Sequence, residues 1–314
     1  MTKYHLGESI GQGTQSVVYR ATDPGSGRMV AVKQIYCPPE SGGSLFPLTS
    51  LGANFREVSA LNQLMMFGHE NIIRFVDMVV RADKLLLVFE HCDENLCQYI
   101  RRVGRKNSRG LPAGLVRDLS CQLLTGMSAV HEARIIHRDV KSENILLKRL
   151  GSSGLLLKVA DFGLAKQYSY PPPIETLDVG SLWYRSPEVL IRSGYDVGMD
   201  LWGIGCVVGE MMTGKALFVE DCEIGMLMKI FQTLGTPRVE DWPAIGYAVN
   251  VSIHWPCWDR VVCMKKFKER ISCQSGMSGF ELLVCLLRYN SNERLRCREA
   301  LRHDFFENSE NKRP

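Results

Sequence analysis

The sequence has no apolar run long enough to cross a bilayer. The run around Leu85–Phe89 is far shorter than the roughly 20 residues that a transmembrane helix needs, so no membrane partner is expected. No secretory leader is recognisable in MTKYHLGESI, and no two cysteines form a CxxC pair. The eleven cysteines are odd in number and irregularly spaced. They therefore predict reduced thiols and a location in the nucleus and/or the cytoplasm.

A strong excess of charge of either sign is also missing. The 38 lysines and arginines against 34 aspartates and glutamates give a formal net charge of +4, so charge predicts no nucleic-acid partner. An apolar fraction of 45% and a charged fraction of 23% are ordinary for a folded globular protein. The 314 residues allow two modest domains or one large domain divided into lobes, and no internal repeat is found.

Hydrophobic periodicity divides the chain into a strand-rich beginning and a helical remainder. Phe55–Met65 has apolar residues at helical spacing, and helical patterns dominate from about Asn95 onward. Leu201–Met212 is apolar on nearly all sides, which predicts a buried central helix with Asp200 as its N-cap. The Pro/Gly/Ser-rich segment 37–52 is expected to form a loop. Strands are expected at Val17–Arg20, Val30–Ile35, Ile73–Val79 and Leu85–Phe89, and a further helix at Leu115–Ala133.

Two short strings indicate the chemistry. HRDVKSEN runs from His137 to Asn144, and DFG runs from Asp161 to Gly163. Phosphoryl transfer needs a carboxylate that receives the attacking hydroxyl and oxygen ligands that hold Mg²⁺ against the phosphates. Asp139 fits the first need. Asn144 and Asp161 fit the second, because Mg²⁺ prefers oxygen donors. Either string alone could be a chance loop, but the pair in this order indicates a phosphotransferase.

A glycine-rich segment and a lysine precede these strings. Gly11–Val18 lies between two strand-like runs, and by itself it fits a hairpin turn as well as a phosphate-binding loop. Lys33 ends the apolar run Val30–Lys33. A lysine in such a strand needs an anionic partner, because burying an unpaired charge is costly. The phosphates of a nucleotide and Glu57 are the two candidates.

With these pieces in order, the chain resembles the eukaryotic protein kinases from Ile10 to about Phe306. The resemblance implies an α+β fold with two lobes: a small antiparallel sheet with one major helix, then a larger, mainly helical part. It implies a single catalytic domain with an N-lobe at 1–91, a C-lobe at 92–314 and a hinge near 90–95. It also implies ATP and Mg²⁺ as cofactors.

The same resemblance implies roles for individual residues. Lys33 would contact the phosphates and pair with Glu57, Asp139 would be the catalytic base, and Lys141 would touch the transferred phosphate. Asn144 and Asp161 would hold Mg²⁺. The residues implied to bind ATP are Ile10, Gly11, Gly13, Val18, Ala31, Lys33, Phe89, Glu90 and Cys92.

A finer resemblance appears in Leu182–Glu188, LWYRSPE, which looks like the WYRxPE string of the proline-directed kinase group. The later segments look most like the cyclin-dependent branch. In this group the residue at the position of Gly180 adopts a left-handed conformation and turns its carbonyl toward Arg185. The position directly after the phosphoacceptor residue is called +1. A substrate proline at +1 has no N–H to donate, so it loses no hydrogen bond there. The plainer interpretation is that Gly180 is only a flexible loop residue.

The resemblance also implies regulation. Thr176 stands where the family carries an activating phosphothreonine, and Arg56, Arg138 and Lys166 would surround that phosphate. A cyclin-type regulatory subunit is the expected partner, and protein substrates with Ser/Thr-Pro sites are the expected targets. In the chain without this partner, Glu57 is expected to lie away from Lys33.

The sequence therefore leaves two hypotheses of function. The first is an active serine/threonine protein kinase. The alternative is a pseudokinase scaffold that binds a cyclin-like partner without turnover. Such scaffolds usually lose the lysine, the base or a metal ligand, and this sequence keeps all of them.

Overall fold

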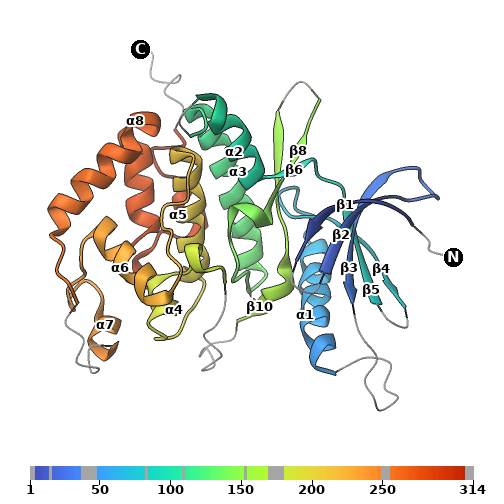
Figure 1. Ribbon diagram of the computed structural model, residues 1–314, viewed down its shortest axis with the longest axis horizontal. Coiled ribbons are helices and arrows are strands. Elements are labelled where there is room, and N and C mark those ends of the chain that lie inside the picture. Colours follow the sequence, from blue (N-terminus) through green and yellow to red (C-terminus); the bar gives the residue numbers. More distant parts are fainter. Residues whose placement is uncertain are drawn as a thin grey trace.

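The fold changes along the chain from a sheet with one large helix to a mainly helical part (Figure 1). The structure, a computed structural model, describes residues 4–13, 16–36, 48–81, 84–107, 110–151, 154–168, 180–248 and 255–307. Figure 1 shows the sheet and α1 at the N-terminal end and helices α2 to α8 at the other. The expected α+β architecture is confirmed. No helix of the described residues is long and apolar enough to span a membrane.

Five antiparallel strands in the order β1-β2-β3-β5-β4 form the first sheet. They confirm the four expected strands, although β4 begins two residues later than the expected Ile73. Strands β3 and β5 bury aliphatic residues on both faces: Val32 and Leu87 are fully buried but belong to separate clusters. The strands are β1 (His5–Gln12), β2 (Ser16–Thr22), β3 (Met29–Tyr36), β4 (Phe75–Val80) and β5 (Lys84–Glu90).

Helix α1 (Leu48–Met65) begins earlier than the sequence pattern predicts. The expected loop is wrong for residues 48–52, and residues 37–47 lie outside the described part of the chain. No proline follows Leu48 within the helix, and the single Gly52 costs only about 1 kcal/mol relative to alanine. The helix buries Leu61 and Leu64 in the main core.

The remainder of the described chain is mostly helical, as expected, with short strands near the first sheet. The helices are α2 (Leu96–Asn107), α3 (Ala113–Glu132), α4 (Pro187–Leu190), α5 (Gly198–Thr213), α6 (Glu223–Leu234), α7 (Pro243–Ala248), α8 (Arg260–Leu286) and α9 (Cys297–Ala300). The 3₁₀ helices are η1 (Ser142–Asn144), η2 (Phe162–Leu164), η3 (Leu182–Tyr184) and η4 (Ser291–Glu293). The strands are β6 (Glu94–Asn95), β7 (Ile135–Ile136), β8 (Ile145–Arg149), β9 (Leu155–Val159) and β10 (Lys166–Gln167). Helix α8 is interrupted at Gly276, whose φ of 67° and ψ of −171° are not helical.

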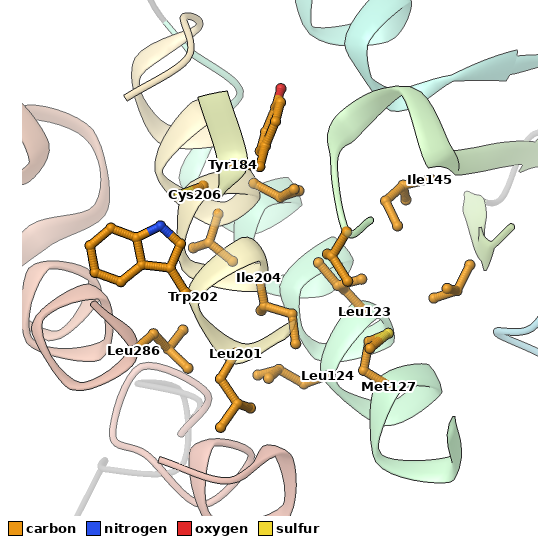
Figure 2. Packing of buried hydrophobic residues seen from close by; sticks show 14 of the residues in the cluster. Leu123, Leu124, Met127, Ile145, Tyr184, Leu201, Trp202, Ile204, Cys206 and Leu286 are labelled. Atoms are coloured by element: carbon orange, nitrogen blue, oxygen red, sulfur yellow. The ribbon is translucent and has the colours of Figure 1, made fainter. Parts of the chain in front are cut away.

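Helix α5 is the centre of the helical part, as its apolar sequence predicts. Trp202 and Ile204 are fully buried, and Figure 2 shows them between Leu123 of α3 and Leu286 of α8. The expected N-cap at Asp200 is wrong: α5 starts at Gly198, so Asp200 lies in its first turn. Its carboxylate instead accepts hydrogen bonds from another segment of the chain, described below.

Candidate active site

A cavity of about 660 Å³ is lined by the first sheet on one side and by the segments around β8 and β9 on the other. Every residue that the sequence resemblance implies for ATP binding lines it. From the first sheet and the segment after it these are Ile10, Gly11, Gly13, Val18, Ala31, Lys33, Phe89, Glu90 and Cys92. From the opposite side come Lys141, Asn144 and Asp161. Residues about 150 positions apart in sequence therefore face one space.

Three charged residues meet at the back of this cavity. The Lys33 ammonium lies 2.9 Å from both carboxylate oxygens of Glu57 and 2.9 Å from Oδ1 of Asp161. Burial opposes the charge on Lys33, but the attraction of the two carboxylates outweighs it and raises the pKa of Lys33. Lys33 therefore stays protonated at neutral pH.

The expectation that Glu57 lies away from Lys33 in the chain without a partner is wrong for this structure. Helix α1 packs against the segment that holds Phe162, and Phe162 is fully buried. This packing holds Glu57, itself 2% exposed, against Lys33. The position of α1 therefore gives no support for a partner requirement.

An ionic cluster around Glu90, the last residue of β5, fixes the start of the segment that follows this strand. The Glu90 carboxylate lies 2.6 Å from Lys158 of β9 and 3.1 Å from Lys148 of β8, and it accepts the Arg74 N–H at 3.0 Å. The Glu90 N–H donates to the Arg74 carbonyl at 3.0 Å. The side chain of Glu90 thus points to β8 and β9, and the Cys92 backbone follows at the cavity wall. Burial raises the pKa of the Cys92 thiol to about 12, so this thiol stays protonated.

Asp139 is the centre of a dense hydrogen-bond network. Its carboxylate lies 2.7 Å from the Lys141 ammonium and accepts the Asn144 side-chain amide at 2.9 Å. The backbone N–H and the hydroxyl of Ser181 both donate to its Oδ1 at 2.9 Å. Lys141 in turn donates to the Ser181 hydroxyl at 2.7 Å. These bonds fix the carboxylate orientation before any substrate arrives.

Two residues that hold this network in place were missed from the sequence. Ser181 precedes the recognised WYRxPE string, and no local pattern marks its bond to Asp139. The Asp200 carboxylate accepts the N–H of His137 at 2.8 Å and that of Arg138 at 2.9 Å. Asp200 is 1% exposed. A buried acid needs partners, so an aspartate at the start of an all-apolar helix was the signal that could have found it.

His131 at the end of α3 completes the support of Asp200. Its Nε2 lies 3.0 Å from the Asp200 carboxylate, and its Nδ1 lies 3.8 Å from the Cys297 thiol. Burial by itself would lower the pKa of His131, but the bonds to Asp200 and Cys297 raise it to about 10. The imidazole is therefore cationic at neutral pH.

This raised pKa predicts a pH-dependent stability. Since the folded pKa of His131 exceeds its ordinary value of about 6.5, its contribution is complete below pH ~6.5 and is lost as the pH rises toward about 10. In this window the free energy of unfolding should fall by up to about 1.4 kcal/mol per pH unit more than in His131→Gln. Urea unfolding of both proteins across the window measures the difference. Parallel pH profiles would contradict a protonated His131.

The segment Gly180–Arg185 has the geometry expected from the sequence. Gly180 has a φ of +79°, and a Cβ there would lie 2.8 Å from the Arg138 carbonyl oxygen. The Arg185 guanidinium donates to the Gly180 carbonyl at 2.9 Å and contacts Glu223 of α6 at 2.5 Å. The positive φ and the close approach both require glycine here. The Gly180 carbonyl is therefore already occupied.

The residues of the implied phosphothreonine pocket lie close together, although Thr176 itself falls outside the described residues. Burial, and then the positive charges of Arg138 and Arg56, lower the pKa of Lys166. The Arg138 side chain donates to the Leu164 carbonyl and to the Tyr195 hydroxyl. Arg138 and Arg56 therefore both lie near Lys166.

Comparison with known proteins gives the family. Residues 4–306 match the family model of the protein kinase domain. The chain belongs to the protein kinase family. It is 37% identical over 298 residues to cyclin-dependent kinase 2 from Caenorhabditis elegans, which covers 95% of this chain and 76% of that protein. It is 36% identical over 315 aligned residues to cyclin-dependent kinase 4 from Sus scrofa, covering 98% of each. This kinase is therefore similar to the cyclin-dependent kinases.

Kinases of this type use ATP and Mg²⁺, and the residues present fit both. The Asn144 amide nitrogen donates to Asp139, which leaves the amide oxygen as its ligand atom. Lys33 contacts Oδ1 of Asp161, whose side chain is 46% exposed. Burial opposes the ionised form of Asp161, but Lys33 outweighs it and lowers the pKa of this carboxyl. An ionised carboxylate and an amide oxygen suit Mg²⁺, which takes its other ligands from phosphates and water.

Proposed function

We propose that this kinase transfers the γ-phosphate of ATP to serine or threonine residues followed by proline. The observation that carries the proposal is the network around Asp139, which holds one carboxylate between Lys141, Asn144 and Ser181. A carboxylate held in this way can accept a hydrogen bond from a substrate hydroxyl and take its proton. Lys141, 2.7 Å away, supplies positive charge beside it.

Lys33 and Glu57 act at the nucleotide in this proposal. Lys33 would give its positive charge to the phosphates, and Glu57 would orient it. Bound Mg²⁺, held by Asn144 and Asp161, would supply charge that neutralises the phosphate oxygens. The remaining cavity wall, from Ile10 and Val18 to Phe89, is mostly apolar and suits the adenine ring.

The occupied Gly180 carbonyl supports a preference for proline. The Gly180 carbonyl is directed toward Arg185, so it is a poorer acceptor for the N–H of a residue directly after the phosphoacceptor (+1), whereas proline has no N–H to satisfy. We expect Ser-Pro peptides to have a kcat/KM about tenfold or more above matched Ser-Ala peptides, measured by steady-state phosphate transfer. A positional peptide profile without a proline preference at +1 would defeat this specificity.

Regulation by a cyclin-type subunit and by phosphorylation of Thr176 is proposed from two supports. The relatives are named cyclin-dependent kinases. The cations Arg56, Arg138 and Lys166 lie close together, and a phosphate on Thr176 would bring about −1.5 to −2 charges that such a cluster could hold. We therefore expect Thr176→Ala to lower kcat/KM severalfold or more in the complex with the regulatory subunit. Unchanged turnover of that complex would count against the switch.

The pseudokinase alternative has no observation in its favour, since the chain keeps Lys33, Asp139, Asn144 and Asp161. A two-step assay separates the two functions. Thermal shift with ATP, with and without Mg²⁺, reports binding, and phosphate transfer to a Ser-Pro peptide reports turnover. Binding without transfer by the phosphorylated, partner-bound protein would favour the scaffold.

A further inference from the structure

One side chain of α1 bonds to two segments of the helical part of the fold. The Gln63 amide nitrogen donates to the Ala133 carbonyl at 2.8 Å, and the Gln63 amide oxygen accepts the Gln167 side-chain amide at 2.7 Å. Gln63 lies in the last turn of α1, Ala133 is the residue that ends α3, and Gln167 belongs to β10. The two partners lie 70 and 104 positions from Gln63 in the sequence, so these bonds join distant segments.

The bond to Ala133 satisfies a carbonyl that α3 cannot satisfy itself. The last carbonyls of a helix have no N–H ahead of them within the helix. The Ala133 N–H still donates to the Ala129 carbonyl, but the chain then leaves the helix and enters β7. Ala133 is 3% exposed, so losing the Gln63 amide would leave its carbonyl buried without this donor, which is costly. The bond therefore favours a position of α1 close to the end of α3.

The bond to Gln167 attaches α1 to the segment that follows Phe162. Strand β10 pairs with β7, where Gln167 lies opposite the fully buried Ile135. Figure 1 shows α1 beside β10, and the two elements are in contact. Packing against η2, which holds Phe162, supports α1 as well. The C-terminal end of α1 is thus held by two side-chain hydrogen bonds in addition to apolar packing.

The position of α1 decides whether Glu57 reaches Lys33. Glu57 lies in the same helix, about two turns before Gln63, and both of its carboxylate oxygens are 2.9 Å from the Lys33 ammonium. A movement of the helix away from α3 and β10 would therefore separate this ion pair. Gln63 is not among the described residues that line the cavity, whereas Lys33 and Glu57 both line it. Gln63 can thus act on the nucleotide site only through α1.

We propose that Gln63 is a positioning residue that keeps the Lys33–Glu57 pair assembled in the chain without a regulatory subunit. Its bonds to α3 and β10 hold α1 in the position that a partner would otherwise have to impose. This inference rests on the proposed function, in which Lys33 contacts the phosphates of ATP, and adds to it a nucleotide site that is complete before any partner binds. A regulatory subunit is then needed for later steps and not for binding the phosphates.

Calorimetric titration of the full chain alone, with ATP and Mg²⁺ or with adenosine, tests the proposal. Adenosine has the base and sugar of ATP but lacks the phosphates that Lys33 contacts. Gln63→Ala removes both bonds, and the apparent affinity for ATP then falls with the fraction of chains that keep α1 in place. We expect the Kd of ATP to rise about fivefold and that of adenosine to change less than twofold. An unchanged Kd for ATP would overturn the inference, and so would an equal rise for both ligands.

Two further variants show whether the bonds act together. Gln167→Ala, at an exposed position, removes one bond and should raise the Kd of ATP about twofold. The double variant Gln63→Ala/Gln167→Ala should bind ATP as Gln63→Ala does, because Gln167 acts through Gln63. Effects that multiply to about tenfold in the double variant would contradict the proposal.

The control is Asn62→Ala, at the exposed neighbouring position of α1, which should leave both dissociation constants unchanged. These titrations use no peptide substrate. The absence of a proline preference would therefore disprove the proposed specificity without affecting this result, and an unchanged Kd for ATP in Gln63→Ala would disprove only the role of Gln63.

Discussion

Asp139→Asn should lower kcat about 10²–10⁴-fold without unfolding the protein. The substitution keeps the shape of the side chain but removes its negative charge and its ability to take a proton. Ser181 donates to Oδ1, whereas Lys141 and Asn144 contact Oδ2, so the single amide oxygen of asparagine can keep only one side of this network, and the attraction of Lys141 is lost. The loss should therefore appear in kcat, measured by phosphate transfer to a Ser-Pro peptide, and only weakly in ATP binding.

The control for this variant is Asp118→Asn, at an exposed position of α3, which should leave kcat unchanged. Both variants should unfold at nearly the same temperature as the unaltered protein. A kcat for Asp139→Asn above about one tenth of the original would show that Asp139 is not the catalytic base.

Arg294→Met should lower the free energy of unfolding by about 3–5 kcal/mol. The Arg294 guanidinium makes a two-pronged ion pair with the Glu188 carboxylate at 2.6 and 2.7 Å. It also donates to the carbonyls of Gly198, Arg288 and Tyr289. Glu188 is 5% exposed, so removing Arg294 leaves a buried carboxylate without its cation. Urea unfolding monitored by circular dichroism measures the change.

Two further variants show whether the loss of stability comes from the burial of Glu188 or from the loss of any ion pair. Arg298→Met breaks the pair with Glu132, which is similarly short at 2.8 Å but exposed, and should cost less than about 1 kcal/mol. The double variant Glu188→Leu/Arg294→Met should recover part of the loss, because no charge then remains buried. Equal losses for Arg294→Met and Arg298→Met would contradict this explanation.

The residues that meet in the cavity were largely predictable from the sequence. Lys33, Glu57, Asp139, Asn144 and Asp161 belong to short strings whose order along the chain is itself informative. The buried helix α5 was predictable for a different reason: an apolar stretch of helical length can only be accommodated in a core.

The wrong predictions for Asp200 and for the start of α1 have one physical cause: contacts with distant segments of the chain can outweigh local sequence preferences. Asp200 has the local pattern of an N-cap, but the N–H groups of His137 and Arg138 offer its carboxylate buried partners across the fold. Helix α1 extends back to Leu48 against a local pattern that predicts a loop.

The sequence by itself determined the family, the catalytic strings and the apolar core, because these depend on residue types and on periodicity. Only the tertiary structure decided that Glu57 pairs with Lys33 in the chain without a partner, and that Ser181 bonds to Asp139. Such features depend on charges and donors brought together from separate segments, and sequence spacing carries no direct record of those distances.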